Sequence, residues 1–212
     1  MINLIKQFIF IHIPKTGGST IKSHLRSIRG NTNVIMHPHI LDYINRLPES
    51  SDFFKFTCVR NPWELVVSRY FYRLKLIENA KGNSRVKNPD ATFDEFVKNE
   101  EVYMNSFKSW VSPKSEAFKM YEEGKSYGSQ YDLISDSDDK ILMDKIIRYE
   151  DFQNQIVELL LSMGIFDNPE LHLNKSEHND YQNYYTAETR NIIANRFIKD
   201  IDYFKYTFEN NS

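Results

Sequence analysis

The sequence predicts a single α/β domain built around a largely parallel sheet. Short runs of β-branched and aromatic residues alternate with stretches in which apolar residues recur at helical spacing. Such alternation is typical of parallel strands that are connected by helices. The chain has 212 residues, a length that favours one domain with an insertion over two domains.

The first half of the chain alternates strands and helices. The first strand is predicted at residues 8–13 and is followed by a proline, two glycines and a helix at residues 20–28. A short strand at residues 34–36 and a helix at residues 40–47 come next. We expect His12, inside the first strand, to be a core histidine.

A second buried strand is predicted at residues 53–59, and a strong helix start follows it. Asn61 is a good N-cap, Pro62 suits the first helical position, and Glu64 lies where a capping residue would reach back. Apolar residues keep helical spacing to about residue 75. We therefore expect a strand, a sharp turn at Arg60 and a long helix.

The second half carries a predicted helical insertion at about residues 75–125, with a polar loop and helices at residues 92–110 and 114–123. A third strand at 141–148, an amphipathic helix at 151–163 and a last helix at 186–203 complete the domain. The aromatic residues that close the chain are expected to belong to the core. One domain, residues 1–212, is thus predicted.

The composition excludes several classes of protein. With 27 Lys and Arg against 29 Asp and Glu, the net charge is −2, which argues against a general nucleic-acid binder but leaves a local anion pocket open. The lone Cys58 can form neither an internal disulfide nor a cysteine-based zinc site, and we expect it to be buried. The apolar N-terminus is too short to span a membrane. We expect a cytoplasmic protein without an integral membrane segment; an enzyme whose membrane anchor lies outside this sequence is the alternative.

The sharpest feature is the loop PKTGGST, residues 14–20, between the first strand and the first helix. Gly17 and Gly18 allow a tight turn and close approach of an anion, and the helix start offers N–H groups and a positive dipole end. The loop also supplies a rigid proline, a cation and hydroxyl donors: Pro14, Lys15, Thr16, Ser19 and Thr20. We interpret it as an anion site; an ordinary strand–turn–helix junction is the alternative.

The order of residues in this loop bears on which anion it binds. The nucleoside-triphosphatase pattern places Lys after its second glycine, whereas Lys15 precedes both glycines here. The best candidate for a magnesium-binding strand end is Asp144, after Ile141, Leu142 and Met143. A Mg-ATP-dependent kinase is therefore kept as an alternative function.

Two sequence motifs resemble those of the PAPS-dependent carbohydrate sulfotransferases, where PAPS is 3′-phosphoadenosine 5′-phosphosulfate. IHIPKTGGST resembles their 5′-phosphosulfate loop, and FTCVRNPWELVVSRYFY, residues 56–72, resembles their strand ending in Arg followed by a helix carrying Ser. Residues 129–152, 174–176 and 184–208 are also similar to this group. The resemblance implies a P-loop-like three-layer α/β/α fold with a central mainly parallel sheet, and PAPS as sulfuryl donor.

The resemblance also implies roles for single residues. The loop would bind the 5′-phosphosulfate, with Lys15 beside the bridging oxygen that gains charge as the S–O bond breaks. Arg60 and Ser68 would bind the 3′-phosphate, and Lys175 and Ser176 would belong to a loop over the nucleotide. A surface ion pair for Arg60 and an incidental helix hydroxyl for Ser68 are the alternatives. No metal is expected.

Sulfuryl transfer to a hydroxyl needs a base, and a neutral histidine suits that task. His37 and His39 lie between the two phosphate motifs, and the uronyl 2-O-sulfotransferases carry a similar His-x-His. The resemblance favours His39 as the base, assisted by His37. A histidine satisfied by its own loop is the alternative, and Glu64 is a competing base by analogy with other sulfotransferases.

The acceptor is predicted less sharply. A groove for a highly sulfated glycan would be basic, and the sequence offers only a modest cluster, namely Arg69, Arg73, Lys75, Lys81, Arg85 and Lys87. We therefore expect a neutral or weakly charged saccharide hydroxyl as the acceptor. A tyrosyl peptide or a lipid headgroup remains an alternative, as does a catalytically silent glycan- or nucleotide-binding protein. Nucleic acid is not expected as a partner, and the oligomeric state is left open.

Overall fold

The computed structural model describes most of the chain. The described residues are 1–26, 28–32, 39–79, 88–100, 102–103, 115–123, 128–165 and 178–209. The predicted strand at residues 34–36 lies outside them.

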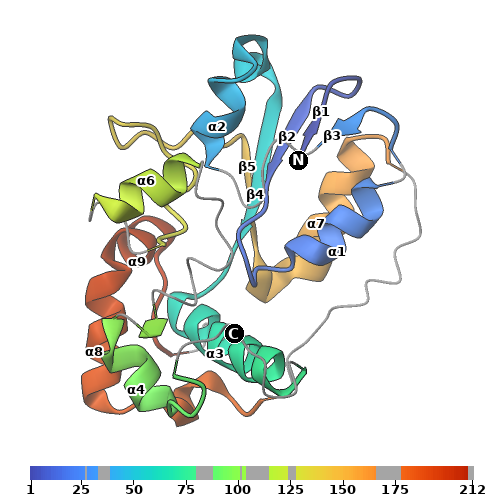
Figure 1. Cartoon of the computed structure of the whole chain (residues 1–212). Coiled ribbons are helices and arrows are strands. Elements are labelled where there is room, and N and C mark those ends of the chain that lie inside the picture. The colour runs from blue at the N-terminus through green and yellow to red at the C-terminus, as the bar shows by residue number, and fades with distance from the viewer. Residues whose placement is uncertain are drawn as a thin grey trace.

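A five-stranded sheet forms the centre of the described structure (Figure 1). Its strands lie in the order β3-β1-β2-β4-β5, and their bounds are β1 (Ile2–Asn3), β2 (Phe8–Ile11), β3 (Asn31–Thr32), β4 (Phe54–Val59) and β5 (Lys145–Arg148). β2, β4 and β5 pair in parallel, whereas β1 is antiparallel to both β2 and β3. Only β1 runs against the others, which confirms the predicted mainly parallel sheet.

The strands differ from the predicted ones at their ends. The third predicted strand begins only at Lys145, because Ile141 makes an isolated bridge to Ser135 before the chain enters the sheet. β2 ends at Ile11, so His12 follows the strand rather than lying inside it, although its side chain is buried as expected. The unpredicted β1 and β3 span two residues each, too few to leave a periodic pattern.

Helices surround the sheet. They are α1 (Gly18–Leu25), α2 (Ile40–Ile44), α3 (Pro62–Asn79), α4 (Phe93–Lys98), α6 (Glu116–Glu122), α7 (Phe152–Ser162), α8 (Ala187–Arg196) and α9 (Ile198–Phe204). The described residues also form the 3-10 turns η1 (Pro48–Asp52), η2 (Tyr149–Asp151) and η3 (Tyr181–Tyr184). The predicted last helix is in fact two, because Phe197 breaks the helical conformation with φ −113° and ψ 30°. None of the described helices is long and apolar enough to cross a bilayer.

Two apolar cores place the helices in layers on either side of the sheet. Phe8, Phe10 and Phe56 face one core, which α1 and α7 cover. Ile9 and Ile11 face the opposite core, which α2, α3, α4, α8 and α9 complete (Figure 1). Because both faces of the sheet are buried, its strands are apolar on both sides rather than alternating. The arrangement is the expected three-layer α/β/α fold.

The described part of the predicted insertion belongs to this second core. Phe96 and Val97 of α4 are fully buried, and α4 packs against both α3 and α8. α4 ends at Lys98, where Asn99 leaves the helical conformation with ψ 101°. It is thus much shorter than the predicted helix, and most of the remainder lies outside the described residues.

Candidate active site

Residues 14–20 form a tight loop between β2 and α1. Gly17 is the N-cap of α1 with φ 82°, and its carbonyl accepts hydrogen bonds from the Thr20 and Ile21 amides at 3.0 and 3.3 Å. Lys15 has φ 70°, a conformation that non-glycine residues adopt only where their surroundings impose it. Left-handed residues in a turn can aim backbone N–H groups into one concave surface. The loop therefore has the shape of an anion cradle.

Both glycines of the loop are required by close contacts. A Cβ on Gly17 would lie 2.7 Å from the Phe152 ring, and a Cβ on Gly18 would lie 1.8 Å from the His12 ring. Phe152 belongs to α7 and His12 follows β2. The loop thus packs closely against both elements, and at Gly17 and Gly18 only backbone atoms fit there.

The loop hydroxyls and the proline are partly buried supports of the loop and partly exposed to a ligand. Thr16 is buried and donates to the Ile13 carbonyl at 2.9 Å, which braces the loop from inside. Pro14 and Thr20 are buried as well, whereas Ser19 is exposed on the first turn of α1. Ser19 is therefore the loop hydroxyl that a ligand reaches most readily.

The side chain of Lys15 lies half-buried against α3. Its ammonium is 4.7 Å from the centroid of the Tyr72 ring, a cation–π contact. The pKa of Lys15 is lowered to about 8, chiefly by burial and also by the nearby charges of Arg60 and Lys75. Burial and these positive neighbours disfavour the charged ammonium, and an anion bound at the loop would offset both effects.

Arg60 connects the two sequence motifs in space. It lies directly after β4 and donates from its guanidinium to the Lys15 carbonyl at 3.1 Å. The guanidinium also pairs with Glu64 at 2.8 Å and covers the Tyr149 ring at 4.0 Å. It is 5% exposed. The structure therefore brings residues 14–20 and Arg60 to one edge of the sheet, where the parallel strands β2 and β4 both end.

The start of α3 follows the prediction in part. Asn61 caps the helix, because its side-chain oxygen accepts from the Trp63 amide at 3.1 Å. The predicted capping role of Glu64 is wrong, since the Asn61 amide donates to Glu150 at 2.6 Å while Glu64 pairs with Arg60. A carboxylate from the neighbouring strand end takes this role because the turn brings it closer.

Ser68 lies one helical turn beyond Glu64 on α3 and is fully buried. Tyr72, one further turn along, carries the Lys15 contact. Glu64, Ser68 and Tyr72 thus form the stripe of α3 that runs past Arg60 and the loop. This spacing could have identified Tyr72 from the sequence. Tyr149 could have been found as the residue after the neighbouring parallel strand β5.

His39 is the N-cap of α2. Its Nδ1 accepts from the Leu41 amide at 3.0 Å, and its own amide donates to Asp42 at 2.7 Å. Its side chain is 1% exposed. Burial lowers the pKa of His39 to about 4, while a hydrogen bond to the Asp132 backbone and the charge of Glu116 act in the opposite direction. The ring therefore serves a cap in this conformation and is neutral at neutral pH.

Several predicted residues lie outside the described part of the chain, namely His37, Lys175, Ser176, Lys81, Arg85 and Lys87. Two members of the predicted basic stretch are described. Arg69 and Arg73 are 2% and 1% exposed and lie inside the packing of α3, beside Tyr103 and Phe96. These two arginines therefore do not line an open groove.

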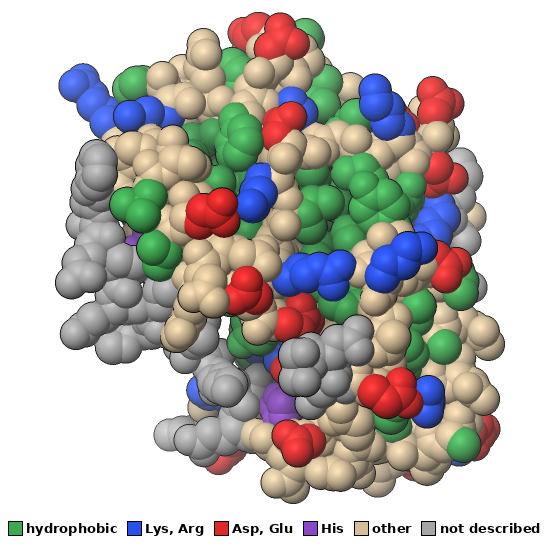
Figure 2. Space-filling model, turned by 180° about the vertical axis from the view of Figure 1, so that it is seen from behind, with side chains coloured by type: hydrophobic (Ala, Val, Ile, Leu, Met, Phe, Trp, Pro, Cys, Tyr) green, Lys and Arg blue, Asp and Glu red, His purple; other side chains and the backbone are tan. Residues whose placement is uncertain are grey.

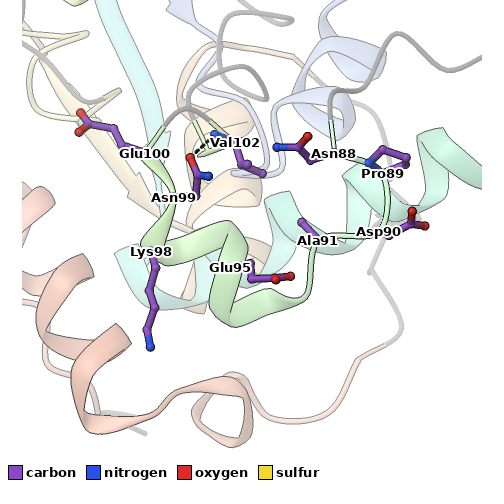
Figure 3. Close-up of a pocket in the computed structure, with 9 residues that line it drawn as sticks. All are labelled: Asn88, Pro89, Asp90, Ala91, Glu95, Lys98, Asn99, Glu100 and Val102. Atoms are coloured by element: carbon purple, nitrogen blue, oxygen red, sulfur yellow. Dashed lines mark hydrogen bonds between the residues drawn. The ribbon is translucent and has the colours of Figure 1, made fainter.

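A cavity of about 920 Å³ lies between α4 and the segment that precedes it (Figure 3). Its lining includes Asn88, Asp90, Ala91, Glu95, Asn99 and Val102. Arg73 of α3 donates to the Asn88 carbonyl, so the cavity rim is attached to the helix that carries Ser68. Lys98 also belongs to the lining (Figure 3), and its ammonium pairs with Asp94 and Glu188. Among the described residues, no three His, Cys, Asp or Glu side chains converge as metal ligands would.

Comparisons with known proteins identify a family from the sequence and a similar fold among solved structures. The model of the sulfotransferase family matches residues 1–207. Among solved structures, the chain is similar to the mouse sulfotransferase SULT7A1, solved in complex with PAP, at 13% identity and a TM-score of 0.50. This similarity covers 96% of the present chain and 87% of the mouse chain. No curated protein matches the sequence.

Proposed function

Because the chain belongs to the sulfotransferase family, we propose that it transfers a sulfuryl group from PAPS to a hydroxyl group of a saccharide. The observation that carries the proposal is the contact between Arg60 and the Lys15 carbonyl. That contact joins an anion loop to a second cationic group at the ends of two parallel strands. Two such groups suit a donor with phosphate groups at both ends of its ribose.

The described residues fit this donor. The backbone at Gly17 and Gly18 leaves no room for a Cβ, and a loop held in this way lets an anion approach backbone N–H groups closely. When bound, PAPS supplies the sulfuryl group. PAP, the compound bound to the mouse relative, is the nucleotide that remains once that group has left.

Lys15 and residues 14–20 are assigned to the 5′-phosphosulfate. The ammonium of Lys15 would lie beside the oxygen that gains negative charge, and it therefore stabilises the transition state more than the ground state. Arg60 and Ser68 are assigned to the 3′-phosphate, for which Arg60 must exchange its bond with Glu64 for a bidentate contact. Lys175 and Ser176 complete the proposed nucleotide site.

His39 is the proposed base, with His37 assisting. In the conformation described, the His39 ring caps α2, so the proposal requires the ring to leave this cap when the acceptor binds. Asparagine is a good N-cap and cannot act as a base. The variant His39→Asn should therefore keep the thermal stability but lose about 10²- to 10⁴-fold in kcat.

The control for this test is His39→Ala, which removes the cap as well. It should lose both activity and about 1 kcal/mol of stability. Near-full turnover by His39→Asn would remove His39 from the mechanism and leave it as a structural residue.

The proposed acceptor is a neutral or weakly charged saccharide. Arg69 and Arg73 are buried, and acidic and basic side chains are interspersed over the described part of the face shown in Figure 2. The lining of the cavity beside α4 holds amides, apolar groups, one cation (Lys98) and three carboxylates (Asp90, Glu95 and Glu100). Such groups hydrogen-bond hydroxyl groups, and the excess of carboxylates disfavours a polyanion. This lining supports the proposed acceptor class.

The test is transfer of labelled sulfate from PAPS to a panel of saccharide, tyrosyl-peptide and lipid acceptors. Wild type should label the saccharide pool, Lys15→Ala should lose most of that transfer, and the exposed-lysine control Lys6→Ala should retain it. If no acceptor pool is labelled although 3′,5′-ADP binds, the protein is a binding module rather than an enzyme. Tighter binding of Mg-ATP than of 3′,5′-ADP would favour the kinase alternative.

A further inference from the structure

The backbone of Arg60 is held by a side chain from a distant part of the sequence. The amide of Gln130 accepts from the Arg60 N–H at 2.8 Å and donates to the Arg60 carbonyl at 2.7 Å. β4 ends one residue earlier, at Val59. Gln130 therefore gives Arg60 the two hydrogen bonds that a neighbouring strand would have given it, and Gln130 is itself fully buried.

A buried carboxylate fixes this amide in turn. Asp200 of α9 is fully buried. Its carboxylate accepts hydrogen bonds from the side-chain Nε2 of Gln130 at 3.0 Å and from the backbone N–H of Gln130 at 3.0 Å. It also accepts from the Ser129 hydroxyl at 2.5 Å and the Tyr131 backbone at 2.8 Å. A carboxylate only accepts, so it determines which end of the Gln130 amide carries the N–H groups. The orientation that serves both Arg60 backbone groups is thereby selected.

The connection matters because the Arg60 backbone decides where its guanidinium lies. From this backbone the side chain reaches the Lys15 carbonyl and stacks on Tyr149. A planar guanidinium binds phosphate through two parallel hydrogen bonds and tolerates little displacement. We propose that Gln130 and Asp200 are positioning residues, which hold Arg60 in register for the phosphate of the nucleotide. The inference rests on the proposed function, in which Arg60 binds that phosphate.

The test measures affinity for 3′,5′-ADP by calorimetry in a double-mutant cycle. Gln130→Ala should weaken binding about 10- to 100-fold, the size of effect expected when a binding group is displaced by about 1 Å. In the Arg60→Ala background the same substitution should change affinity by less than about 2-fold, because Gln130 acts through Arg60. An equal loss in both backgrounds would show that Gln130 does not act through Arg60 and would overturn the inference.

Asn3→Ala is the matched control. Asn3 is also a fully buried amide, and its side chain bonds the backbones of Ile5, Lys6 and Arg29, but it lies in β1, two strands from β4 in the sheet. It should lower the melting temperature as Gln130→Ala does and leave the affinity unchanged. Loss of stability without loss of affinity in Gln130→Ala would make Gln130 a structural residue like Asn3.

Two volume-conserving variants keep the test independent of the folding of the alanine variant. Gln130→Met removes both bonds to Arg60, and Asp200→Asn removes the fixed orientation of the amide. Both variants should bind 3′,5′-ADP more weakly than wild type and show faster hydrogen exchange at the Arg60 backbone amide. If wild type binds no 3′,5′-ADP, the proposed function fails; unchanged exchange at Arg60 in Gln130→Met would instead overturn the positioning role.

Discussion

At the scale of single residues, Lys15 combines a left-handed backbone, an aromatic neighbour and a lowered pKa. The pKa of about 8 is the property that kinetics can detect. The proposed role needs the protonated ammonium, so kcat/KM for PAPS, which reports the free enzyme, should fall as the pH rises through about 8. Lys15→Arg keeps its charge at all accessible pH values, and its profile should lack this alkaline limb.

The same shift has an effect on stability with a defined sign. The folded-state pKa of Lys15 lies below the ordinary lysine value of 10.5, so the unfolded chain binds more protons between about pH 8 and 10.5. The contribution of Lys15 to the free energy of unfolding therefore rises with pH across that window. If the fall of kcat/KM near pH 8 persists in Lys15→Arg, the group that titrates in the kinetic profile is not Lys15.

Gly17 and Gly164 offer a second test at the residue scale. Both have positive φ, 82° and 66°, but a Cβ on Gly17 would meet the Phe152 ring at 2.7 Å whereas a Cβ on Gly164 would meet nothing within 4 Å. Gly164→Ala should cost about 1–2 kcal/mol of stability through the backbone alone and leave 3′,5′-ADP binding intact. Gly17→Ala should lower the stability by more than this and should also weaken nucleotide binding. Urea denaturation measures the stability, and calorimetry measures the binding. Equal effects would show that the Phe152 contact is unimportant.

At the scale of elements, the start of α3 depends on the C-terminal segment. Asn61 caps α3 and donates from its side chain to the Thr207 carbonyl at 2.8 Å. The Tyr206 hydroxyl reaches Glu150, the carboxylate that accepts from the Asn61 amide. The segment after α9 thus holds the turn that presents Arg60. Phe204 and Tyr206 are 4% and 7% exposed, as predicted for the aromatic end of the chain, whereas Tyr203 is 49% exposed and lies outside the core.

This dependence predicts different costs for two N-caps. Thr92→Ala at α4 removes only a capping box and should cost about 1 kcal/mol. Asn61→Ala also removes the hydrogen bond that Asn61 donates to the Thr207 carbonyl and should cost roughly 0.5–1.5 kcal/mol more. Urea denaturation gives both values, and calorimetry should show weaker 3′,5′-ADP binding for Asn61→Ala alone. If the two variants show similar stability losses and similar 3′,5′-ADP binding, the C-terminal segment does not support the site.

At the scale of the whole molecule, a ligand that joins the loop to Arg60 should stabilise the fold. A ligand at 100 times its Kd adds about 2.7 kcal/mol to the free energy of unfolding, which raises the melting temperature by roughly 5–10 °C in a chain of this size. We expect 3′,5′-ADP to produce such a shift in a thermal melt and Mg-ATP to produce a smaller one. Arg60→Ala should remove most of the shift, and a larger shift with Mg-ATP would contradict the proposed donor.

Local features of the sequence determined the longer strands, several helix starts and the two motifs. The glycines at 17 and 18 required a tight turn, and Asn61 with Pro62 required a helix start, because caps and turns depend on residues that are adjacent in the chain. The apolar runs determined β2 and β4 for the same reason. These features were enough to predict an α/β fold with a largely parallel sheet, whereas the three layers and the placement of Lys15 and Arg60 at one site followed from the resemblance of the two motifs to those of sulfotransferases.

Only the tertiary structure decided which distant groups serve that site. Glu150 replaced Glu64 as the partner of the Asn61 amide, and Gln130 with Asp200 took hold of the Arg60 backbone. Such contacts join residues about 70 to 90 positions apart, and hydrogen bonds of this kind form wherever packing leaves a buried polar group to be satisfied. The periodicity and motif spacing of the sequence therefore do not predict which of these distant residues pair. The sequence therefore determined which chemistry is present at the sheet edge, and the hydrogen bonds from Asp200 of α9 through Gln130 to Arg60 decided how firmly that chemistry is held.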